Sequence, residues 1–262
     1  MQPHAKNTDF TWRSPAAPFA LVSQAQADAY DRLGGFVLED AFSSAEVDAV
    51  LAALDPLEAQ ANAALRKKSD AAPSIARADE IIFDAHVVTR SEVLREFATH
   101  SVFVALCQDL IGPAVRLYWD QLVYKRPGTV DEFPWHQDNG YTYVEPQHYL
   151  TCWVALTDAT PDNGCPWIAP GVHRQGTLRH RWTDIGFRCL ERPEDALPLP
   201  ARAGSVVVFS SLTPHMTGPN LTDEVRKSYI LQYAPDGALV HPHFGGEPQL
   251  ASDPQRQFMV TA

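Results

Sequence analysis

The sequence has little cysteine. Only four of its 262 residues are cysteine, namely Cys107, Cys152, Cys165 and Cys189, and none of them forms a C-x-x-C pair. A disulfide scaffold needs a much higher density of cysteine than this. We therefore expect reduced thiols and a cytoplasmic protein.

Long apolar runs are also missing. No run approaches the ~18–20 residues that cross a bilayer, so we expect no membrane-spanning segment. Residues 16–22 faintly resemble the apolar core of a secretory signal, but Pro15 and Pro18 interrupt the pattern and Asp9 spoils its basic end. We therefore expect no secretory signal.

Positive charge is scarce. The chain has 21 lysines and arginines against 32 aspartates and glutamates, which gives a formal net charge of −11. An acidic protein repels a phosphate backbone and an anionic membrane surface. The balance argues against nucleic acid and membranes as partners and favours a small-molecule substrate, and it leaves the oligomeric state open.

Apolar residues make up 45% of the chain, which is enough for the core of one domain over residues 1–262. Residues 1–23 contain three prolines and predict a poorly ordered or surface-draped arm. Residues 24–113 predict a mainly helical layer. The sequence pattern then changes from helical periodicity to short β-rich runs. Residues 114–240 therefore predict a β-barrel core, and residues 241–262 predict a tail.

Two long helices are expected in the helical layer. Ser43 stands three residues before Glu46, which is the pattern of a capping box, and opens an amphipathic helix. Pro56 bends or ends that helix, residues 57–68 resume it, and residues 69–79 predict a loop.

The second helix is expected over residues 92–111, where apolar residues recur at helical spacing until Gly112-Pro113 stops it. Beyond Pro113, short β-rich runs alternate with turn residues, and no helical pattern long enough for a βαβ crossover separates them. The sequence predicts a mainly β fold with N-terminal helices packed on an antiparallel double-sheet barrel. The expected strands are 115–124, 133–137, 149–156, 166–169, 205–210 and 228–233.

His136 and Asp138 are the first residues that suggest chemistry. On a strand, residues i and i+2 point to one face and can hold one metal ion through a nitrogen and a carboxylate oxygen. About one H-x-[D/E] triplet is expected by chance in a chain of this composition, so a surface histidine near an aspartate is the alternative. A second histidine, His215, follows the apolar strand at Val206–Phe209, where a rigid scaffold often presents a ligand and where a plain turn residue is the alternative. Two histidines and one carboxylate on a β scaffold form the facial triad of non-haem iron(II) oxygenases.

Arg226 lies eleven residues past His215, at the head of the strand at 228–233. A tight turn between two antiparallel strands would return it to the metal, where its planar guanidinium can bind a carboxylate through two hydrogen bonds. A surface arginine next to Lys227 is the alternative.

These motifs occur in the same order in a known family. The chain resembles the phytanoyl-CoA dioxygenase family of iron(II)- and 2-oxoglutarate-dependent oxygenases, which fold as a double-stranded β-helix, a jelly-roll or cupin-like barrel. The resemblance covers roughly residues 34–233. The motifs that carry it are Tyr124-Lys125-Arg126-Pro127-Gly128, Trp135-His136-Gln137-Asp138, Asp162-Asn163-Gly164-Cys165, Ile168-Ala169-Pro170-Gly171-Val172-His173, His215-x-x-Gly218-Pro219-Asn220 and Arg226.

The resemblance implies roles for individual residues. It makes His136, Asp138 and His215 the iron ligands and Arg226 the partner of the C5 carboxylate of 2-oxoglutarate. It also places Thr217, Lys125 and Trp153 near that cosubstrate. The residues alone leave open a solvated strand end for Lys125 and a core aromatic for Trp153.

The substrate-binding residues are less clearly marked. We expect candidates in Tyr141, Tyr143, Trp167 and Arg174, with core or surface packing as the alternative for each. Arg174, Arg179, His180 and Arg181 form a basic cluster that could receive an anionic group, although a solvated loop is the favoured interpretation. His241-Pro242-His243 is interpreted as a surface loop rather than a metal site, and Asn163-Gly164 as a hairpin turn.

The expected activity is hydroxylation of an unactivated C–H bond with Fe(II), 2-oxoglutarate and O2, releasing succinate and CO2. Related halogenases have a small residue in place of the carboxylate ligand, so Asp138 favours hydroxylation over halogenation. Desaturation, cyclisation and epimerisation remain alternatives with the same cofactors. A metal-binding cupin-like barrel without oxygenase turnover is an alternative of another class, and Arg226 argues against it because such a barrel needs no carboxylate clamp.

Overall fold

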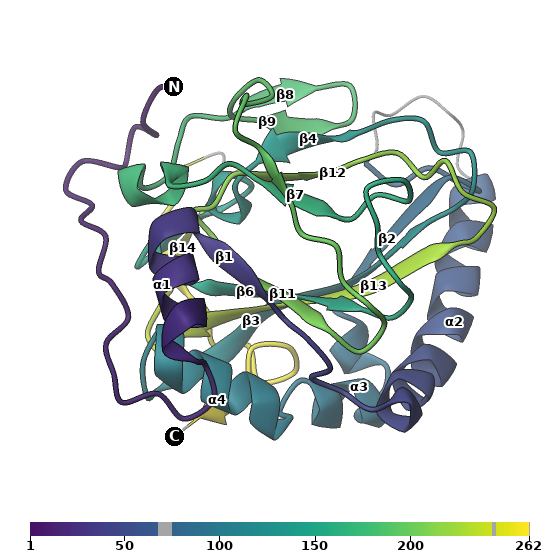
Figure 1. The fold of residues 1–262 in the computed structure, drawn as a ribbon, viewed down its shortest axis with the longest axis horizontal. Helices are drawn as coiled ribbons and strands as arrows, with labels where there is room; N and C mark the ends of the chain where they lie inside the picture. The colour runs from purple at the N-terminus through teal and green to yellow at the C-terminus, as the bar shows by residue number, and fades with distance from the viewer. Residues whose placement is uncertain (68–74, 243–244, 262) are drawn as a thin grey trace.

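The computed structural model describes residues 1–67, 75–242 and 245–261. Two antiparallel sheets face each other, and helices cover the outer face of the larger one (Figure 1). This architecture confirms the predicted mainly β fold with N-terminal helices. The larger sheet has the order β1-β11-β6-β13-β3-β16, and β2 also pairs with β3. Its strands are β1 (Gly35–Leu38), β2 (Ile81–Ala85), β3 (Val115–Lys125), β6 (Leu150–Ala155), β11 (Val206–Ser210), β13 (Arg226–Pro235) and β16 (Met259–Thr261).

The smaller sheet lies opposite, with the order β10-β7-β12-β4. A three-stranded sheet, β15-β14-β5, and the hairpin β8–β9 complete the strands. The strands of the smaller sheet are β4 (Phe133–His136), β7 (Pro166–Ile168), β10 (Leu197–Pro198) and β12 (His215–Thr217). The others are β5 (Tyr143–Glu145), β8 (Arg181–Thr183), β9 (Gly186–Arg188), β14 (Leu239–His241) and β15 (Gln249–Leu250).

α2 begins at the capping box predicted from the sequence, and α1 begins at a capping box that was not predicted. Both α1 and α2 open with a complete capping box, formed by Ser23 with Gln26 and by Ser43 with Glu46. α2 continues through Pro56, so this proline does not end it. The helices are α1 (Gln24–Leu33), α2 (Ser44–Arg66), α3 (Glu92–Phe97) and α4 (Ser101–Leu110), with short 3-10 turns η1 (Val87–Thr89), η2 (Asp138–Gly140) and η3 (Val172–Gln175). No helix within these described ranges is long and apolar enough to span a bilayer.

The single helix expected over 92–111 is wrong, because α3 and α4 are separate. α3 ends at Phe97, and the side chain of His100 accepts a hydrogen bond from the amide of Val102, which starts a new helix. A side chain that caps a backbone amide competes with continuation of the preceding helix.

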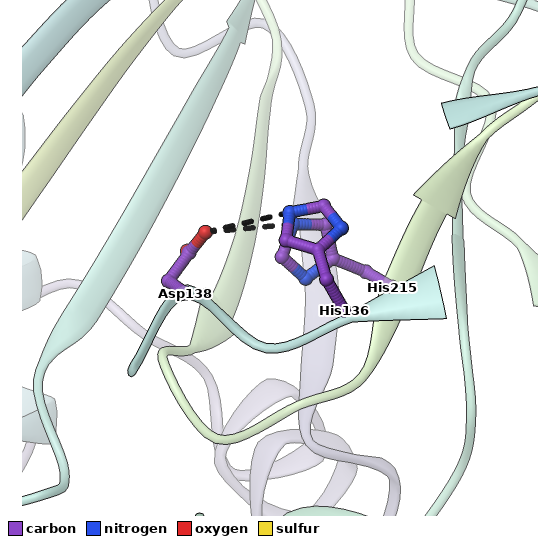
Figure 2. Close-up of side chains that lie close together, drawn as sticks. All are labelled: His136, Asp138 and His215. Carbon is purple, nitrogen blue, oxygen red and sulfur yellow. Dashed lines mark ion pairs between the residues drawn. The ribbon is translucent and has the colours of Figure 1, made fainter. Parts of the chain in front are cut away.

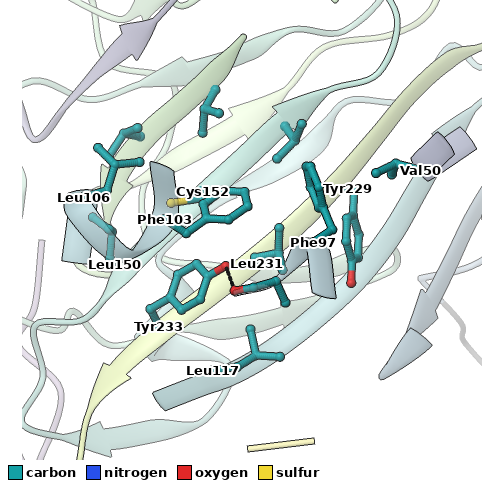
Figure 3. Packing of buried hydrophobic residues seen from close by; sticks show 14 of the residues in the cluster. Val50, Phe97, Phe103, Leu106, Leu117, Leu150, Cys152, Tyr229, Leu231 and Tyr233 are labelled. Atoms are coloured by element: carbon teal, nitrogen blue, oxygen red, sulfur yellow. Dashed lines mark hydrogen bonds between the residues drawn. The ribbon is translucent and has the colours of Figure 1, made fainter. Parts of the chain in front are cut away.

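Alternation along the strands separates the core from the inner cavity. On β13, Tyr229, Leu231 and Tyr233 point outward and pack against side chains of α3 and α4 (Figure 3). The hydroxyl of Tyr233 donates to the carbonyl of Ala98, which fixes the helices on the sheet. The intervening residues of β13, including Ile230, face the other side. The larger sheet therefore carries the main core on its outer face and a binding surface on its inner face.

Some expected segment roles need correction. The layer at 24–113 also contributes β1 and β2 to the larger sheet, and the tail at 241–262 contributes β16, which pairs with β3. The arm at 1–23 is draped over the surface, where the carboxylate of Asp109 accepts hydrogen bonds from three amides between Ala20 and Val22. The end of the α2 prediction at Lys68 and the expected loop at 69–74 lie outside the described residues.

Candidate active site

The site is built on two neighbouring strands of the smaller sheet. His136 on β4 and His215 on β12 are direct register partners, and their ring centroids lie 4.1 Å apart. Each ring donates from Nδ1 to the carbonyl two residues earlier, that of Pro134 at 2.8 Å and that of Thr213 at 3.0 Å. Because Nδ1 carries the proton in both rings, Nε2 keeps its lone pair for a metal.

Asp138 completes the donor set from the start of η2. Its Oδ1 lies 3.8 Å from Nε2 of His136 and 3.7 Å from Nε2 of His215 (Figure 2). The three ligand atoms lie within 4.8 Å of one another. The second oxygen, Oδ2, accepts the hydroxyl of Thr151 on β6 at 2.5 Å. The three side chains that were predicted as ligands therefore point at one place.

The chemistry of this donor set fits iron(II). Burial, with a smaller contribution from the neighbouring His215, holds the pKa of His136 well below its usual range, so the imidazole is neutral and ready to ligate. Two imidazole nitrogens and one carboxylate oxygen are the facial triad of non-haem iron oxygenases. The alternative of a surface histidine near an aspartate is excluded, because His136 and His215 are both only 7% exposed.

The residue between the ligands holds the loop in place. The buried Gln137 donates from Nε2 to the carbonyls of Gly176 and Leu212, and its Oε1 accepts from the amide of Leu178. Its backbone amide donates to Nε2 of His180 at 2.9 Å. The segment after β4 is thus tied to η3 and to the segment that leads into His215.

A cavity of about 390 Å³ opens between the two sheets and includes the three ligands. Arg226, only 1% exposed, lines it from the first position of β13. Its Nη1 donates to the hydroxyl of Ser228 at 2.6 Å, whereas Nε and Nη2 have no hydrogen-bond partner. Burial lowers the pKa of Arg226 to about 10, which leaves the guanidinium charged at neutral pH.

A buried cation with two unpaired donors calls for an anion, because an unpaired buried charge is costly. The C5 carboxylate of 2-oxoglutarate fits this requirement. Trp153 and Thr217 line the same cavity, and the ring of Trp153 lies 5.2 Å from Cζ of Arg226. Both therefore line the cavity that holds Arg226 and the three predicted ligands.

The path that brings Arg226 to the cavity differs from the expected tight turn between paired strands. β12 and β13 belong to different sheets, so the loop at 218–225 crosses from one to the other. The side chain of Asn220 shapes this loop by donating to the carbonyls of Lys125 and Glu224. Asn220 therefore fixes the loop that leads into β13, whose first residue is Arg226.

Lys125 does not line the cavity. It is the register partner of Arg226, is fully buried, and donates from Nζ to the carbonyl of Gly218 at 2.5 Å. Burial, with a smaller contribution from Arg226, lowers its pKa to about 7. Lys125 also donates to the carbonyl of Asp131 at 3.4 Å, and the alternative of a solvated strand end is excluded.

Of the four expected substrate residues, only Tyr141 lines the cavity. Tyr143 donates its hydroxyl to the carbonyl of Lys6 in the N-terminal arm. The ring of Trp167 lies under the guanidinium of Arg192, 5.1 Å from its Cζ. Arg174 pairs with Asp31 at 2.5 Å on the surface. These three side chains contact Lys6, Arg192 and Asp31 and do not line the cavity. Residue type alone did not predict these contacts.

Three minor expectations are also settled. The basic cluster is not uniformly solvated, because His180 is largely enclosed and contacts Gln137. Asn163-Gly164 forms a turn but not a hairpin, since β6 and β7 lie in different sheets. The expected surface loop is wrong at His241, which ends β14 and pairs with Glu145 at 3.0 Å, whereas His243 lies outside the described residues.

Several residues at the site were missed from sequence. Thr151, Gln232 and Gln121 face the cavity from three strands of the larger sheet, and Phe187 lines it from β9. Period-2 alternation predicts that Thr151 and Trp153 share a face, which could have identified Thr151. For the others, no pattern in the sequence distinguishes them from ordinary strand residues.

Comparison with known proteins shows the family of the chain. A sequence model of the family "Phytanoyl-CoA dioxygenase (PhyH)" matches residues 30–228. Together, the fold and the donor set define the class of non-haem iron, 2-oxoglutarate-dependent oxygenases. The chain belongs to the phytanoyl-CoA dioxygenase family.

Among curated relatives, the chain is 29% identical over 143 residues to a phytanoyl-CoA dioxygenase of Arabidopsis thaliana, covering 52% of this chain and 50% of that protein. It is 30% identical to a methylphosphonate hydroxylase of Gimesia maris, covering 53% of each. The chain thus spans about half the length of these relatives. An ectoine dioxygenase of Bordetella bronchiseptica is 26% identical over 87% of this chain and 80% of its own length.

Solved structures share the fold. The carbocyclase SnoK from nogalamycin biosynthesis has a TM-score of 0.74 at 23% identity, covering 92% of this chain and 97% of that chain. The epimerase SnoN, in complex with Fe³⁺, alpha-ketoglutarate and nogalamycin RO, has a TM-score of 0.73 at 24% identity, covering 90% and 98%. These likenesses support the jelly-roll assignment.

Proposed function

We propose that the protein is an iron(II)/2-oxoglutarate-dependent dioxygenase that hydroxylates an unactivated C–H bond of a small molecule. The observation that carries the proposal is the presence, in one cavity, of a two-histidine, one-carboxylate set and a buried arginine with unpaired donors. A barrel that only stores metal has no use for such an arginine.

Each residue has a role in this proposal. His136, Asp138 and His215 hold the iron, and Arg226 binds the C5 carboxylate of 2-oxoglutarate, with the Thr217 hydroxyl beside it. Iron and 2-oxoglutarate, when bound, supply an oxidant from O2 and release succinate and CO2. The aromatic walls exclude water, which protects a reactive site from side reactions.

Asp138 favours hydroxylation as the outcome. Its carboxylate takes the ligand position that a halide would need. The relatives named methylphosphonate hydroxylase and ectoine dioxygenase support oxygenation, whereas the structures named epimerase and carbocyclase share only the fold. Epimerisation, cyclisation and desaturation are therefore outcomes of the test rather than parts of the proposal.

The test is turnover of 2-oxoglutarate under ¹⁸O₂ with Fe(II) and chloride present, analysed by mass spectrometry. We expect succinate that carries one labelled oxygen atom, and an organic product with a hydroxyl group and no chlorine once a substrate is supplied. The His215→Ala variant is the control and should form no succinate above the protein-free background, because it removes a member of the donor set without opening the halide position at Asp138. Equal succinate from the wild type and this variant would overturn the proposal.

A further inference from the structure

The cavity has two ends, and β13 runs between them. Arg226, Ile230 and Gln232 line it from one face of this strand. Six residues of extended strand separate the backbones of Arg226 and Gln232 by about 20 Å, at ~3.3 Å per residue. The register partner of Gln232 on β6 is Thr151, whose hydroxyl binds Asp138. Gln232 therefore lies level with Asp138, about 20 Å along β13 from the cosubstrate arginine.

Much of the cavity wall is aromatic. Phe83 and Phe133 pack with ring centroids 5.4 Å apart, and Tyr141 meets Phe187 edge-on at 5.2 Å. Trp119 lines the cavity from β3, at the position paired with Gln232. Such walls favour an apolar, ring-shaped body, because aromatic faces and edges pack well against other rings.

The cavity lining has few charged side chains. Among the described residues that line the cavity, Arg226 and Asp138 are the only arginine, lysine, aspartate or glutamate side chains. Both have roles in the proposed function, so neither is left to pair with a charged substrate. Burying an unpaired charge is costly, which disfavours an anionic or cationic group beside the metal.

Two neutral amides supply the polar contacts. Gln232 is only 7% exposed, lines the cavity, and its carboxamide makes no hydrogen bond to any described residue. Gln121 accepts from Nε1 of Trp119 at 3.1 Å through its oxygen, which leaves its NH2 group available. Both amides face the cavity, so a ligand that displaces water there must hydrogen-bond them or leave them unpaired at a cost.

We propose that the substrate presents an uncharged apolar ring body to the metal and that the carboxamide of Gln232 hydrogen-bonds a carbonyl or hydroxyl group on it. This inference rests on the proposed function, because it takes Arg226 and Asp138 as occupied by the cosubstrate and the metal. Gln232 is thus a specificity-determining residue.

The first experiment compares two probes that share a ring system and differ in charge. 2-Acetylnaphthalene is neutral, whereas 2-naphthoate is an anion at pH 7.5. Binding to the anaerobic protein with Fe(II) and saturating 2-oxoglutarate is measured by equilibrium dialysis. We expect the ketone to bind at least tenfold more tightly than the carboxylate. Equal or tighter binding of the carboxylate, or no binding of either probe, would overturn the inference.

The second experiment tests the hydrogen bond. Gln232→Leu removes it at similar volume, and Gln232→Met does so with a more flexible side chain in case the leucine variant does not fold. Either variant should weaken the binding of 2-acetylnaphthalene by about 3- to 10-fold, which is the range for the loss of one hydrogen bond. It should leave 2-ethylnaphthalene, which lacks the oxygen, within twofold of its wild-type affinity. Gln60→Leu, an exposed change on α2, is the control. Equal weakening of both probes would show repacking and reject the hydrogen bond.

Failure of this inference is distinguishable from failure of the proposed function. The wild-type protein without a probe reports the function through labelled succinate, while the dialysis needs no turnover. Succinate formation together with a preference for 2-naphthoate would reject the substrate class and keep the oxygenase. Absence of succinate would reject the oxygenase whatever the probes do.

Discussion

The hydroxyl of Thr151 donates to Oδ2 of Asp138 at 2.5 Å and leaves Oδ1 facing both histidines. One carboxylate oxygen is thus occupied by a neighbour on the larger sheet, while the other is directed at the metal position. Groups that orient a metal ligand in this way commonly contribute 10- to 100-fold in metal affinity. Thr151 therefore links the larger sheet to a metal centre built on the smaller one.

The change Thr151→Val tests this link, since valine keeps the shape and removes the hydroxyl. We expect Fe(II) affinity to fall by about 10-fold or more, because Asp138 loses the partner that holds its orientation. Anaerobic Fe(II) titration gives the affinity, and thermal unfolding of the metal-free protein checks the fold. Thr11→Val, an exposed change in the N-terminal arm, is the matched control. Unchanged Fe(II) affinity in Thr151→Val would show that Asp138 is oriented without it.

Removing the guanidinium should impair cosubstrate binding. Arg226→Ala is expected to raise the KM for 2-oxoglutarate roughly 10- to 150-fold, the range of a charge-assisted contact of ~1.5–3 kcal/mol. Arg226→Lys should recover only part of this loss, because an ammonium does not offer two parallel donors. Arg202→Ala removes an exposed arginine that pairs with Asp40 and should leave the KM unchanged. A wild-type KM in Arg226→Ala would move the clamp to another residue.

The predicted ligands could be identified from the sequence because they lie in short local motifs. His136 and Asp138 lie two residues apart, and the motif from His215 to Asn220 is local, so the sequence was sufficient to single them out. β12 was missed because it is only three residues long and lies between Pro214 and Gly218, which are typical of turns. Its identity as a strand depends on pairing with β4 and β7.

The substrate residues could not be predicted because their orientation depends on long-range contacts. Tyr143 turns toward the N-terminal arm, where its hydroxyl meets the carbonyl of Lys6. Gln232 is an ordinary polar residue of a strand until the register of β13 against β6 places it beside Thr151. A sequence pattern shows which residues of a strand share a face. It does not show which other part of the chain packs against that face.

His180 should affect the metal through Gln137. Its Nε2 accepts the backbone amide of Gln137 and its Nδ1 donates to the carbonyl of Leu178, so His180→Leu leaves that amide unpaired. We expect Fe(II) affinity to fall about 10-fold, with partial recovery in His180→Gln, whose side-chain oxygen can accept the same hydrogen. The absorption spectrum of the Co(II)-loaded protein should change in the leucine variant, because it reports ligand geometry.

A second change approaches His180 from its neighbour. A Cβ on Gly140 would lie 1.9 Å from Cε1 of His180, so Gly140→Ala must displace the ring. It should therefore reproduce the metal-binding loss of His180→Leu. Two other glycines are unsuitable as controls. Gly128 has a positive φ, which an alanine would strain, and Gly218 has room for a Cβ but lies in the loop beside the site. The exposed change Ala52→Ser on α2 serves as the control for a small substitution away from the ring. Wild-type Fe(II) affinity in both His180→Leu and Gly140→Ala would contradict a positioning role.

Asp120 carries a buried charge on the outer face of the larger sheet. It is fully buried, and its Oδ2 accepts from the amide of Val88 and the hydroxyl of Tyr229, while Oδ1 has no hydrogen-bond partner. Burial raises the pKa of Asp120 from 3.8 to about 6. The nearby His86 does not compensate, because burial lowers its pKa to about 4 and leaves it neutral.

This carboxyl should make the protein less stable as pH rises. Because the folded pKa is above the unfolded value, its favourable contribution is fully present below pH ~4 and is lost as pH rises through ~6. Two pKa units correspond to about 3 kcal/mol. Asp120→Asn keeps an acceptor for Val88 and removes the charge, so we expect it to stabilise the protein relative to wild type by about 2 kcal/mol more at pH 8 than at pH 4.5. Urea unfolding of both proteins at the two pH values measures this difference. Asp48→Asn, an exposed change on α2, is the control and should show no such difference. A stability difference between Asp120→Asn and wild type that is the same at both pH values would show that Asp120 does not titrate between them.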